Sequence, residues 1–299
     1  MIENPAKSET SADTNVTDTK KDEESWGSFL KFCLKLVLAV LLFRTLIASF
    51  FTIPSESMLP GLRIGDYLVA AKWPYGYNEN SLPLGLPGPK ERIFGSMPER
   101  GDVVIFKHPV DRTDYVKRAI GLPGDTIAMR DGQLILNGQP VQREEAGYAD
   151  IPMSSNTACR ADGGLVVDNL CRYRQFRETL PSGKSYLTID FGNVGARPLS
   201  DANGQLMVDG NGRPVMIDPD NTAPFVVPAG KIFVMGDNRD NSLDSRYPAV
   251  GGQGVGIIDE ELLVGRAGMV LWSTDGSAEW LLPWTWFTAA RWDRIGEGI

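Results

Sequence analysis

Two serines, Ser55 and Ser57, stand between Pro54 and Pro60 in the stretch "FFTIPSESMLP", directly after a hydrophobic segment. A simple linker at this position would not need two closely spaced hydroxyl groups. A serine becomes a nucleophile only when a neighbouring group activates it, most often by removing its proton. The first question is therefore which residue elsewhere in the chain can act as the base.

The chain contains one histidine, His108, which lies in "IFKHPVD" at an apparent strand end. A Ser-His-Asp triad would have to use it, but an exposed loop histidine is the more ordinary interpretation of this position. Metal-dependent hydrolysis is equally disfavoured, because the sequence has no histidine cluster and no HExxH motif. We expect no metal and no other cofactor.

A lysine is the other available base, since burial disfavours the charged ammonium and lowers its pKa. Lys117 in "DYVKRAIGLPGD" is the best candidate, because Val116, Ala119 and Ile120 surround it in the sequence. If the segment is a strand, Arg118 points to the opposite face. Taken alone, the motif more often describes a strand lysine that points to water.

The elements that must position these residues are mostly β-strands. After Ile53, apolar runs such as "GDYLVAAKW", "RGDVVIFKHP" and "GKIFVMGDN" are bounded by Gly, Asp or Pro, as strands are. Asp131-Gly132 and Asn137-Gly138 are strong signals for tight turns between strands. We therefore predict a mainly β protein with an antiparallel sheet as its core.

Composition divides the chain into four parts. Residues 1–25 are polar and acidic and are expected to form a disordered tail, and residues 26–52 contain the hydrophobic segment. Segments 53–130 and 225–299 are expected to pair in one β domain. Residues 131–224, with weak strands and many Gly, Asn and Asp turns, are expected to form an inserted β-rich subdomain.

The hydrophobic segment runs for 25 residues from Phe29 to Ile53 without Gly or Pro. As a helix it would rise about 1.5 Å per residue, enough to cross an apolar bilayer core of about 30 Å. We therefore expect one N-terminal transmembrane helix. No small-x-small cleavage site follows it, which favours an uncleaved signal anchor. Arg44 lies deep in the segment, where a charge is costly.

The distribution of charged residues indicates how the chain is oriented in the membrane and argues against a nucleic-acid partner. Four lysines precede the apolar part, which favours a cytoplasmic N-terminus and places the remaining chain on the other side of the membrane: Lys20, Lys21, Lys31 and Lys35. The formal net charge of the chain is -8. A nucleic-acid binder usually shows a basic patch or stripe, so no nucleic-acid partner is expected.

Two further features concern the environment of the protein. Cys159 and Cys171 enclose a loop rich in Gly and Asp, and a disulfide between them is plausible in an oxidising compartment. Four tryptophans lie close together near the C-terminus, where they form either part of a core or an aromatic belt at a membrane interface: Trp280, Trp284, Trp286 and Trp292.

Four motifs occur in order behind the hydrophobic segment: "IPSESM", "RGDVVIFKHP", "DYVKRAIGLPGD" and "GDNRDNSLDSR". Any one of them would be a weak signal. Together they resemble the motif set of bacterial type I signal peptidases, which are membrane-anchored Ser/Lys proteases. The resemblance covers roughly residues 36–130 and 225–275.

The resemblance implies a role for each matching residue. Ser57 would be the nucleophile and Lys117 the general base, while the Ser55 hydroxyl and the Ser57 backbone N–H would form the oxyanion hole. Ser242 would orient the lysine amine. Other matching residues would make supporting polar contacts (Asp237, Asp244, Arg246 and Arg118) or wall the substrate pocket (Ile53, Pro54, Met58, Leu62, Leu68 and Val116). The family usually has Gly where this chain has Glu56, whose side chain must then point away from the scissile bond.

The resemblance also implies the reaction and its setting. The enzyme would remove N-terminal signal peptides from exported precursor proteins at small-x-small sites, through an acyl-enzyme. It would contact membrane lipid, act near the protein-export machinery, and lie in the inner membrane as a single-pass protein with its catalytic domain on the periplasmic side. One alternative is a catalytically inactive, membrane-anchored binding module of the export machinery. Another, a self-cleaving repressor-type Ser/Lys protease, would need an N-terminal DNA-binding domain in place of the hydrophobic segment.

Overall fold

The computed structural model describes residues 26–82, 85, 87–279 and 281–299. The predicted disordered tail, residues 1–25, and Trp280 lie outside the described residues. The chain forms two compact units, Met1–Val40 and Leu41–Ile299. The second unit contains every strand and every residue predicted for the site, and the description below concerns it unless stated otherwise.

The N-terminal helix, α1, spans Trp26–Leu46 and buries none of its side chains. Over the described residues, no helix combines the length and the apolar character that crossing a membrane requires, so the predicted transmembrane helix is not found. The predicted extent, 26–52, is also wrong, because the helix ends before the apolar stretch does. Residues Ala48–Thr52 instead form strand β1, which pairs antiparallel with β2, Asp66–Ala71. The backbone groups of β1 that face β2 are satisfied by that strand rather than by a helix.

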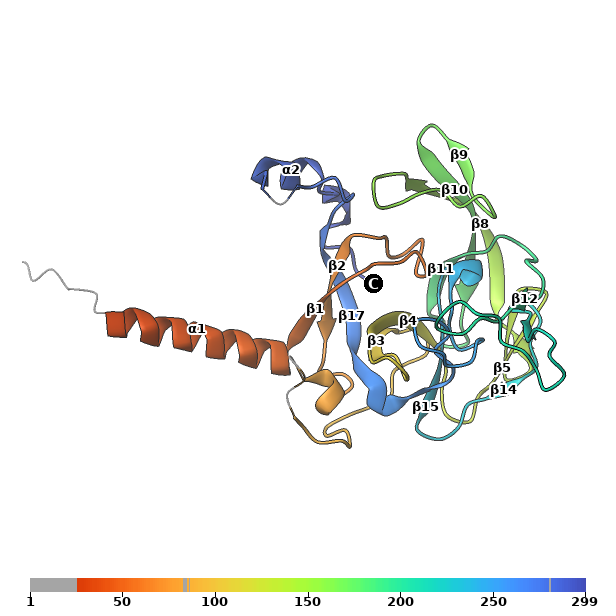
Figure 1. The fold of residues 1–299 in the computed structure, drawn as a ribbon, viewed down its shortest axis with the longest axis horizontal. Helices are drawn as coiled ribbons and strands as arrows, with labels where there is room; N and C mark the ends of the chain where they lie inside the picture. The colour runs from red at the N-terminus through yellow and green to blue at the C-terminus, as the bar shows by residue number, and fades with distance from the viewer. Residues whose placement is uncertain (1–25, 83–84, 86, 280) are drawn as a thin grey trace, which may run out of the picture. The chain divides into compact units, whose positions relative to one another are not determined.

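The main sheet has seven strands in the order β1-β2-β17-β3-β4-β15-β16, and every pairing is antiparallel (Figure 1). The prediction of a mainly β, antiparallel core is confirmed. The sheet joins strands from both sides of residues 131–224, named here the middle region. Its other strands are β3 Val103–Lys107, β4 Asp114–Gly121, β15 Lys231–Met235, β16 Ile258–Asp259 and β17 Leu263–Ser273.

A second sheet, in the order β14-β5-β6-β7, contains both turns that the sequence signalled. Asp131-Gly132 and Asn137-Gly138 have positive φ at all four residues, as the tight two-residue hairpin turns require. The predicted domain boundary at 130/131 falls within the first of these turns. Strands of one sheet therefore lie on both sides of it: β5 Thr126–Arg130, β6 Gln133–Leu136, β7 Gln139–Pro140 and β14 Phe225–Val226.

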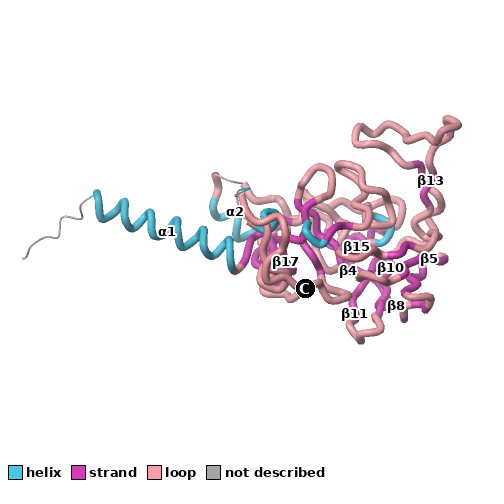
Figure 2. Tube along the Cα trace, turned by 90° about the horizontal axis from the view of Figure 1, so that it is seen from below, coloured by secondary structure: helices cyan, strands magenta, loops and turns pink. Residues whose placement is uncertain are grey.

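The middle region contains several strands, and loops make up much of the chain between them (Figure 2). Its larger sheet has the order β11-β10-β8 with β9 beside β10, and it meets the segment after β15 through a bridge between Ile189 and Asn238. Its strands are β8 Gln142–Pro152, β9 Leu165–Val167, β10 Leu170–Thr179, β11 Ser185–Ile189, and the separate pair β12 Arg197–Pro198 and β13 Met216–Ile217. That this region is a distinct inserted domain stays a prediction.

Short helical elements complete the fold: η1 Glu79–Ser81, η3 Arg239–Asn241, η4 Glu260–Leu262, α2 Pro283–Thr288 and η5 Trp292–Arg294. One core cluster bears directly on the site. It packs Ile53 and Met58, which flank the serine pair, against Leu68, Val103 and Val270 of the main sheet. The burial of these apolar side chains fixes the segment between β1 and β2 on the sheet.

Candidate active site

The nucleophile candidate lies in the turn between β1 and β2. Ser57 is buried, with 8% of its surface exposed, and Met58 and Leu59 after it are buried in the core. The Ser57 carbonyl accepts a hydrogen bond from the Asn238 N–H at 3.1 Å, and the Glu56 carbonyl accepts one from the Leu59 N–H at 3.1 Å. The turn is therefore held from below by apolar packing and from one side by the segment after β15.

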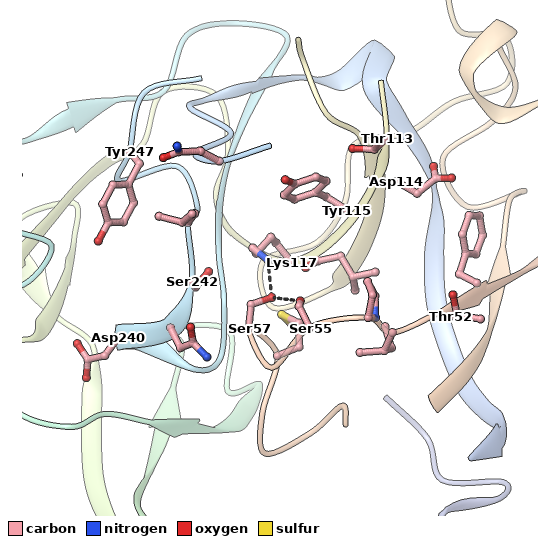
Figure 3. A pocket seen from close by; sticks show the side chains of 18 of the residues that line it. Thr52, Ser55, Ser57, Thr113, Asp114, Tyr115, Lys117, Asp240, Ser242 and Tyr247 are labelled. Atoms are coloured by element: carbon pink, nitrogen blue, oxygen red, sulfur yellow. Dashed lines mark hydrogen bonds between the residues drawn. The ribbon is translucent and has the colours of Figure 1, made fainter. Parts of the chain in front are cut away.

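Lys117 lies on β4 with 4% of its surface exposed. Its Nζ is 2.6 Å from Ser57 Oγ and 3.1 Å from the Val116 carbonyl oxygen, and Figure 3 shows the two side chains pointing toward each other. Burial lowers the Lys117 pKa from 10.5 to about 8, although the carboxylates of Asp244 and Asp237 act in the opposite direction. The structure places the lysine against the serine rather than in water.

Ser55 lies beside the pair, with its Oγ 3.3 Å from Ser57 Oγ. The Ser57 backbone N–H has no hydrogen-bond partner among the described residues. Two donors that the chain itself leaves available are thus adjacent to the nucleophilic oxygen.

Two buried ion pairs lie behind the lysine. Arg118, the next residue on β4, donates to both carboxylate oxygens of Asp237 at 2.8 and 2.6 Å. Arg246 pairs with Asp244 at 2.9 and 3.0 Å, and Asp244 also accepts the Gly236 N–H at 3.0 Å. Neither pair exposes a free charge, and both brace the chain that follows β15. The four residues predicted to make supporting polar contacts are therefore brought together.

Ser242 lines the same cavity as Ser57 and Lys117. Its hydroxyl is buried and helps to lower the pKa of the Asp244 carboxyl group through a side-chain interaction. Among the described residues, no hydrogen bond joins it to Lys117 (Figure 3). The lysine amine instead donates to Ser57 and to the Val116 carbonyl. Orientation of the lysine amine by Ser242 stays a prediction.

A cavity of about 580 Å³ opens over the serine and the lysine. Four of the six predicted pocket residues line it: Ile53, Pro54, Met58 and Val116. Leu62 and Leu68 do not, because both are buried in the core cluster beneath, with 1% and 0% of their surface exposed. In Figure 3, Thr52 and Asp114 lie at one end of the cavity and Asp240 and Tyr247 at the other, with the reactive pair between them.

Several contributors to the site were not singled out from the sequence. Asn238 holds the serine turn through its N–H and through its Nδ2, which is 3.2 Å from the Glu56 carbonyl oxygen. Gly236 is needed for close approach, since a Cβ there would collide with the Ser242 side chain and the Ser57 carbonyl. Both lie in the recognised motif "GDNRDNSLDSR", which was the available signal. Arg160 and Arg197 line the cavity from the middle region, and no motif marked them.

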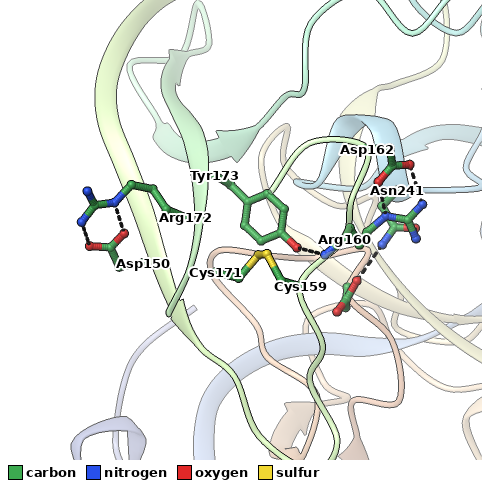
Figure 4. Close-up of a disulfide and its surroundings, with 9 residues drawn as sticks. Asp150, Cys159, Arg160, Asp162, Cys171, Arg172, Tyr173 and Asn241 are labelled. Carbon is green, nitrogen blue, oxygen red and sulfur yellow. Dashed lines mark hydrogen bonds and ion pairs between the residues drawn. A yellow bond between two sulfur atoms is a disulfide. The ribbon is translucent and has the colours of Figure 1, made fainter. Parts of the chain in front are cut away.

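The middle region reaches the cavity beside a disulfide. The sulfur atoms of Cys159 and Cys171 are 1.91 Å apart, with their Cα atoms separated by 5.1 Å. Arg160 follows Cys159 directly and donates through its N–H to the Tyr173 hydroxyl at 3.2 Å (Figure 4). Over the described residues, no three His, Cys, Asp or Glu side chains gather in an arrangement suited to a metal ion.

Comparison with known proteins identifies the family of this chain. The family described as "Signal peptidase, peptidase S26" matches residues 26–272. The chain belongs to this family. Curated relatives named signal peptidase I include those of Rickettsia massiliae, 33% identical over 264 residues, and Rickettsia akari, 34% identical over 264 residues. Each alignment covers 87% of this chain and 83% of the relative.

Among solved structures, a signal peptidase I from Enterococcus faecalis V583 shares 24% identity, with a TM-score of 0.26 over 57% of this chain and 97% of that chain. The family match includes the serine turn, β4 and the "GDNRDNSLDSR" segment, and therefore every residue of the candidate site described above.

Proposed function

We propose that this protein is a signal peptidase I, a serine endopeptidase that removes N-terminal signal peptides from exported precursor proteins. The observation that carries the proposal is the contact of 2.6 Å between the Nζ of buried Lys117 and the Oγ of buried Ser57, at the base of an apolar-walled cavity. Membership of the peptidase S26 family supports the same reaction class.

The geometry supports a Ser/Lys dyad. Neutral Lys117 accepts the Ser57 hydroxyl proton while Oγ attacks the scissile carbonyl carbon. The Ser55 hydroxyl and the Ser57 N–H donate to the oxygen that becomes negative. As the intermediate collapses, the lysine passes its proton to the leaving amine, and an acyl-enzyme remains. Water then hydrolyses this ester, with Lys117 again acting as the base.

An exposed strand edge supports binding of an extended peptide. On one side, Asp114–Lys117 of β4 pair with β3. On the other side, β15 pairs with β4 only from Arg118 to Gly121, so the edge of the earlier residues faces the cavity without a strand partner. A peptide can add there as a strand and place alternate side chains in the cavity. The walls formed by Ile53, Met58 and Val116 favour small side chains before the cleaved bond.

Replacing Ser55 with Ala should lower kcat about 100- to 1,000-fold, the usual loss for one oxyanion donor. KM should change little, because the donor acts mainly on the charge that forms during the reaction. Steady-state cleavage of a precursor peptide measures both constants. Ser155→Ala, an exposed serine of the middle region, is the matched control and should retain normal kinetics; an equal loss in both variants would contradict the assignment of Ser55.

The location is part of the proposal. The side chains of α1 are exposed apolar groups over most of its length, and Leu281, Trp284 and Phe287 near α2 are also exposed. We propose that these surfaces bind membrane lipid close to the export machinery. Flotation of the full chain with liposomes tests this, and removal of residues 1–46 should weaken lipid binding, because only the surface at Leu281, Trp284 and Phe287 remains. Recovery of the intact chain in the unbound fraction would contradict it.

The disulfide supports a catalytic body outside the cytoplasm, because disulfides persist in oxidising compartments such as the periplasm. Mass spectrometry of protein isolated without reductant should find Cys159 linked to Cys171. Cys33, the remaining cysteine, is free in the structure and should be alkylated in the same sample. Alkylation of all three thiols would contradict both the pairing and the compartment.

The direct test of the function is cleavage of a purified precursor with an Ala-x-Ala site by the full chain in lipid or detergent. N-terminal sequencing should show one cut directly after that site. A precursor with a large side chain in place of the last Ala should resist cleavage. If neither precursor is cut, the signal peptidase proposal fails.

A further inference from the structure

Glu56, the residue between the two serines, has contacts that the mechanism above does not use. Its side chain is half-buried and is not among the residues that line the cavity, whereas Ser55 and Ser57 on either side are. Its φ is not in the left-handed region, so the position does not require the glycine that the family usually has. The side chain turns away from the reactive pair, and Glu56 Oε2 accepts a hydrogen bond from Asn241 Nδ2 at 3.0 Å.

Asn241 continues this connection into the middle region. It ends η3, directly before Ser242, and its Oδ1 accepts a hydrogen bond from Arg160 at 3.2 Å. Arg160 also forms a two-bond ion pair with Asp162, at 3.0 and 2.8 Å (Figure 4). An unbroken series of contacts therefore runs from the turn that holds the serines, through one side chain of η3, to the loop that the disulfide closes.

The electrostatics of this series are consistent with a fixed contact. Burial raises the Glu56 pKa, while the Arg160 guanidinium and the Asn241 hydrogen bond lower it. Asp162 opposes them, because its charge also raises the Glu56 pKa. Arg160 is anchored at its main chain by the Tyr173 hydroxyl and by its neighbour Cys159 in the disulfide. The Arg160 main chain is therefore fixed, while its side chain is held by hydrogen bonds to Asp162 and Asn241.

We propose that Glu56 is a positioning residue: through Asn241 and Arg160 it ties the turn carrying Ser55 and Ser57 to the loop clamped by Cys159 and Cys171. The hydrogen bonds that Asn238 donates through its N–H and its Nδ2 hold one side of the turn, and Glu56 holds the other. The tether keeps both hydroxyls aligned with Lys117 and the substrate carbonyl. The inference rests on the proposed peptidase function, since alignment matters only if the serine attacks.

The first test compares E56A, E56Q and the control E145A, which replaces an exposed glutamate of the middle region paired with Arg174. Misplacement of reacting groups by a fraction of an ångström costs rate rather than binding, so E56A should lower kcat about tenfold with KM within twofold. E56Q, which can still accept the Asn241 hydrogen bond, should stay within about threefold of wild type. A kcat for E56A within twofold of wild type, or an equal loss in E56Q, would overturn the proposal.

A double-mutant cycle tests the pathway. Residues that act through one contact are not additive, so E56A combined with N241A should be no slower than the slower single variant, within about twofold. Replacing both Cys159 and Cys171 with Ser should lower kcat about three- to tenfold in the wild-type background but less than twofold in E56A. Full additivity in either combination would overturn the tether.

Amide hydrogen exchange separates failure of the inference from failure of the function, because it needs no precursor. The Leu59 N–H bonds to the Glu56 carbonyl, and the Asn238 N–H bonds to the Ser57 carbonyl. Peptides containing these amides should exchange faster in E56A and N241A than in the wild type. Their exchange rates in E145A should equal those of the wild type. If wild type cleaves but E56A shows normal kcat and exchange, the tether is wrong. If wild type cleaves nothing, the peptidase proposal fails and unchanged exchange in E56A would still overturn the tether.

Discussion

Replacing Ser57 with Ala, or Lys117 with Met, should abolish precursor cleavage, lowering kcat by about 10⁴-fold or more. Removing one member of a nucleophile–base unit usually costs nearly as much as removing the whole unit. The two side chains are 2.6 Å apart and buried together, so among the described residues no other base lies close enough to replace Lys117. The measurement is single-turnover cleavage of an Ala-x-Ala precursor, with long incubations to detect residual product.

Matched controls decide whether such a loss is chemical or structural. Lys231→Met removes a lysine from β15 that pairs with Asp259 at 2.5 Å, and Ser277→Ala removes an exposed serine. Both should cleave at nearly wild-type rates. All variants should bind the precursor and unfold at similar temperatures. Wild-type activity in either Ser57→Ala or Lys117→Met would disprove the dyad and would mean that other residues carry the cleavage. Absence of cleavage by the wild type and by every variant would favour the alternative of a catalytically inactive binding module.

The second large effect concerns pH. A lysine acts as a base only in its neutral form, and burial lowers the Lys117 pKa from 10.5 to about 8. The kcat/KM of the free enzyme should therefore rise about tenfold per pH unit up to about pH 8 and level off above it. At pH 6, close to 99% of the amines would be protonated, so activity should be about one hundredth of the plateau.

The profile should be measured from pH 5.5 to 9.5 at constant ionic strength, with a peptide that has no group titrating in this range. Circular dichroism over the same interval must show that the protein stays folded. A profile that is flat between pH 6 and 8 would rule out Lys117 as the base. A midpoint near 10.5 would show that the amine is solvated, in conflict with its burial in the structure.

Much of the fold could be expected from local sequence patterns. Alternating and short apolar runs indicated strands, and Asp131-Gly132 and Asn137-Gly138 indicated hairpin turns, because only a few residue types accept positive φ at low cost. The end of α1 could not be predicted in this way. Ala48–Thr52 continue the apolar run but form β1, since pairing with Asp66–Ala71 satisfies their backbone groups.

The candidate site likewise depended partly on the local sequence and partly on the tertiary structure. The sequence by itself determined which residues are chemically able to act, Ser55, Ser57 and Lys117, because their types and motif order do not depend on distant contacts. Tertiary structure decided the environment of each one. The burial of Lys117 and the burial of Leu62 and Leu68 in the core beneath the cavity both follow from packing among segments far apart in the chain. The hydrogen bonds from Asn241 to Glu56 and from Arg160 to Asn241 join three such segments. No local pattern encodes them, because each partner is supplied by a different part of the fold.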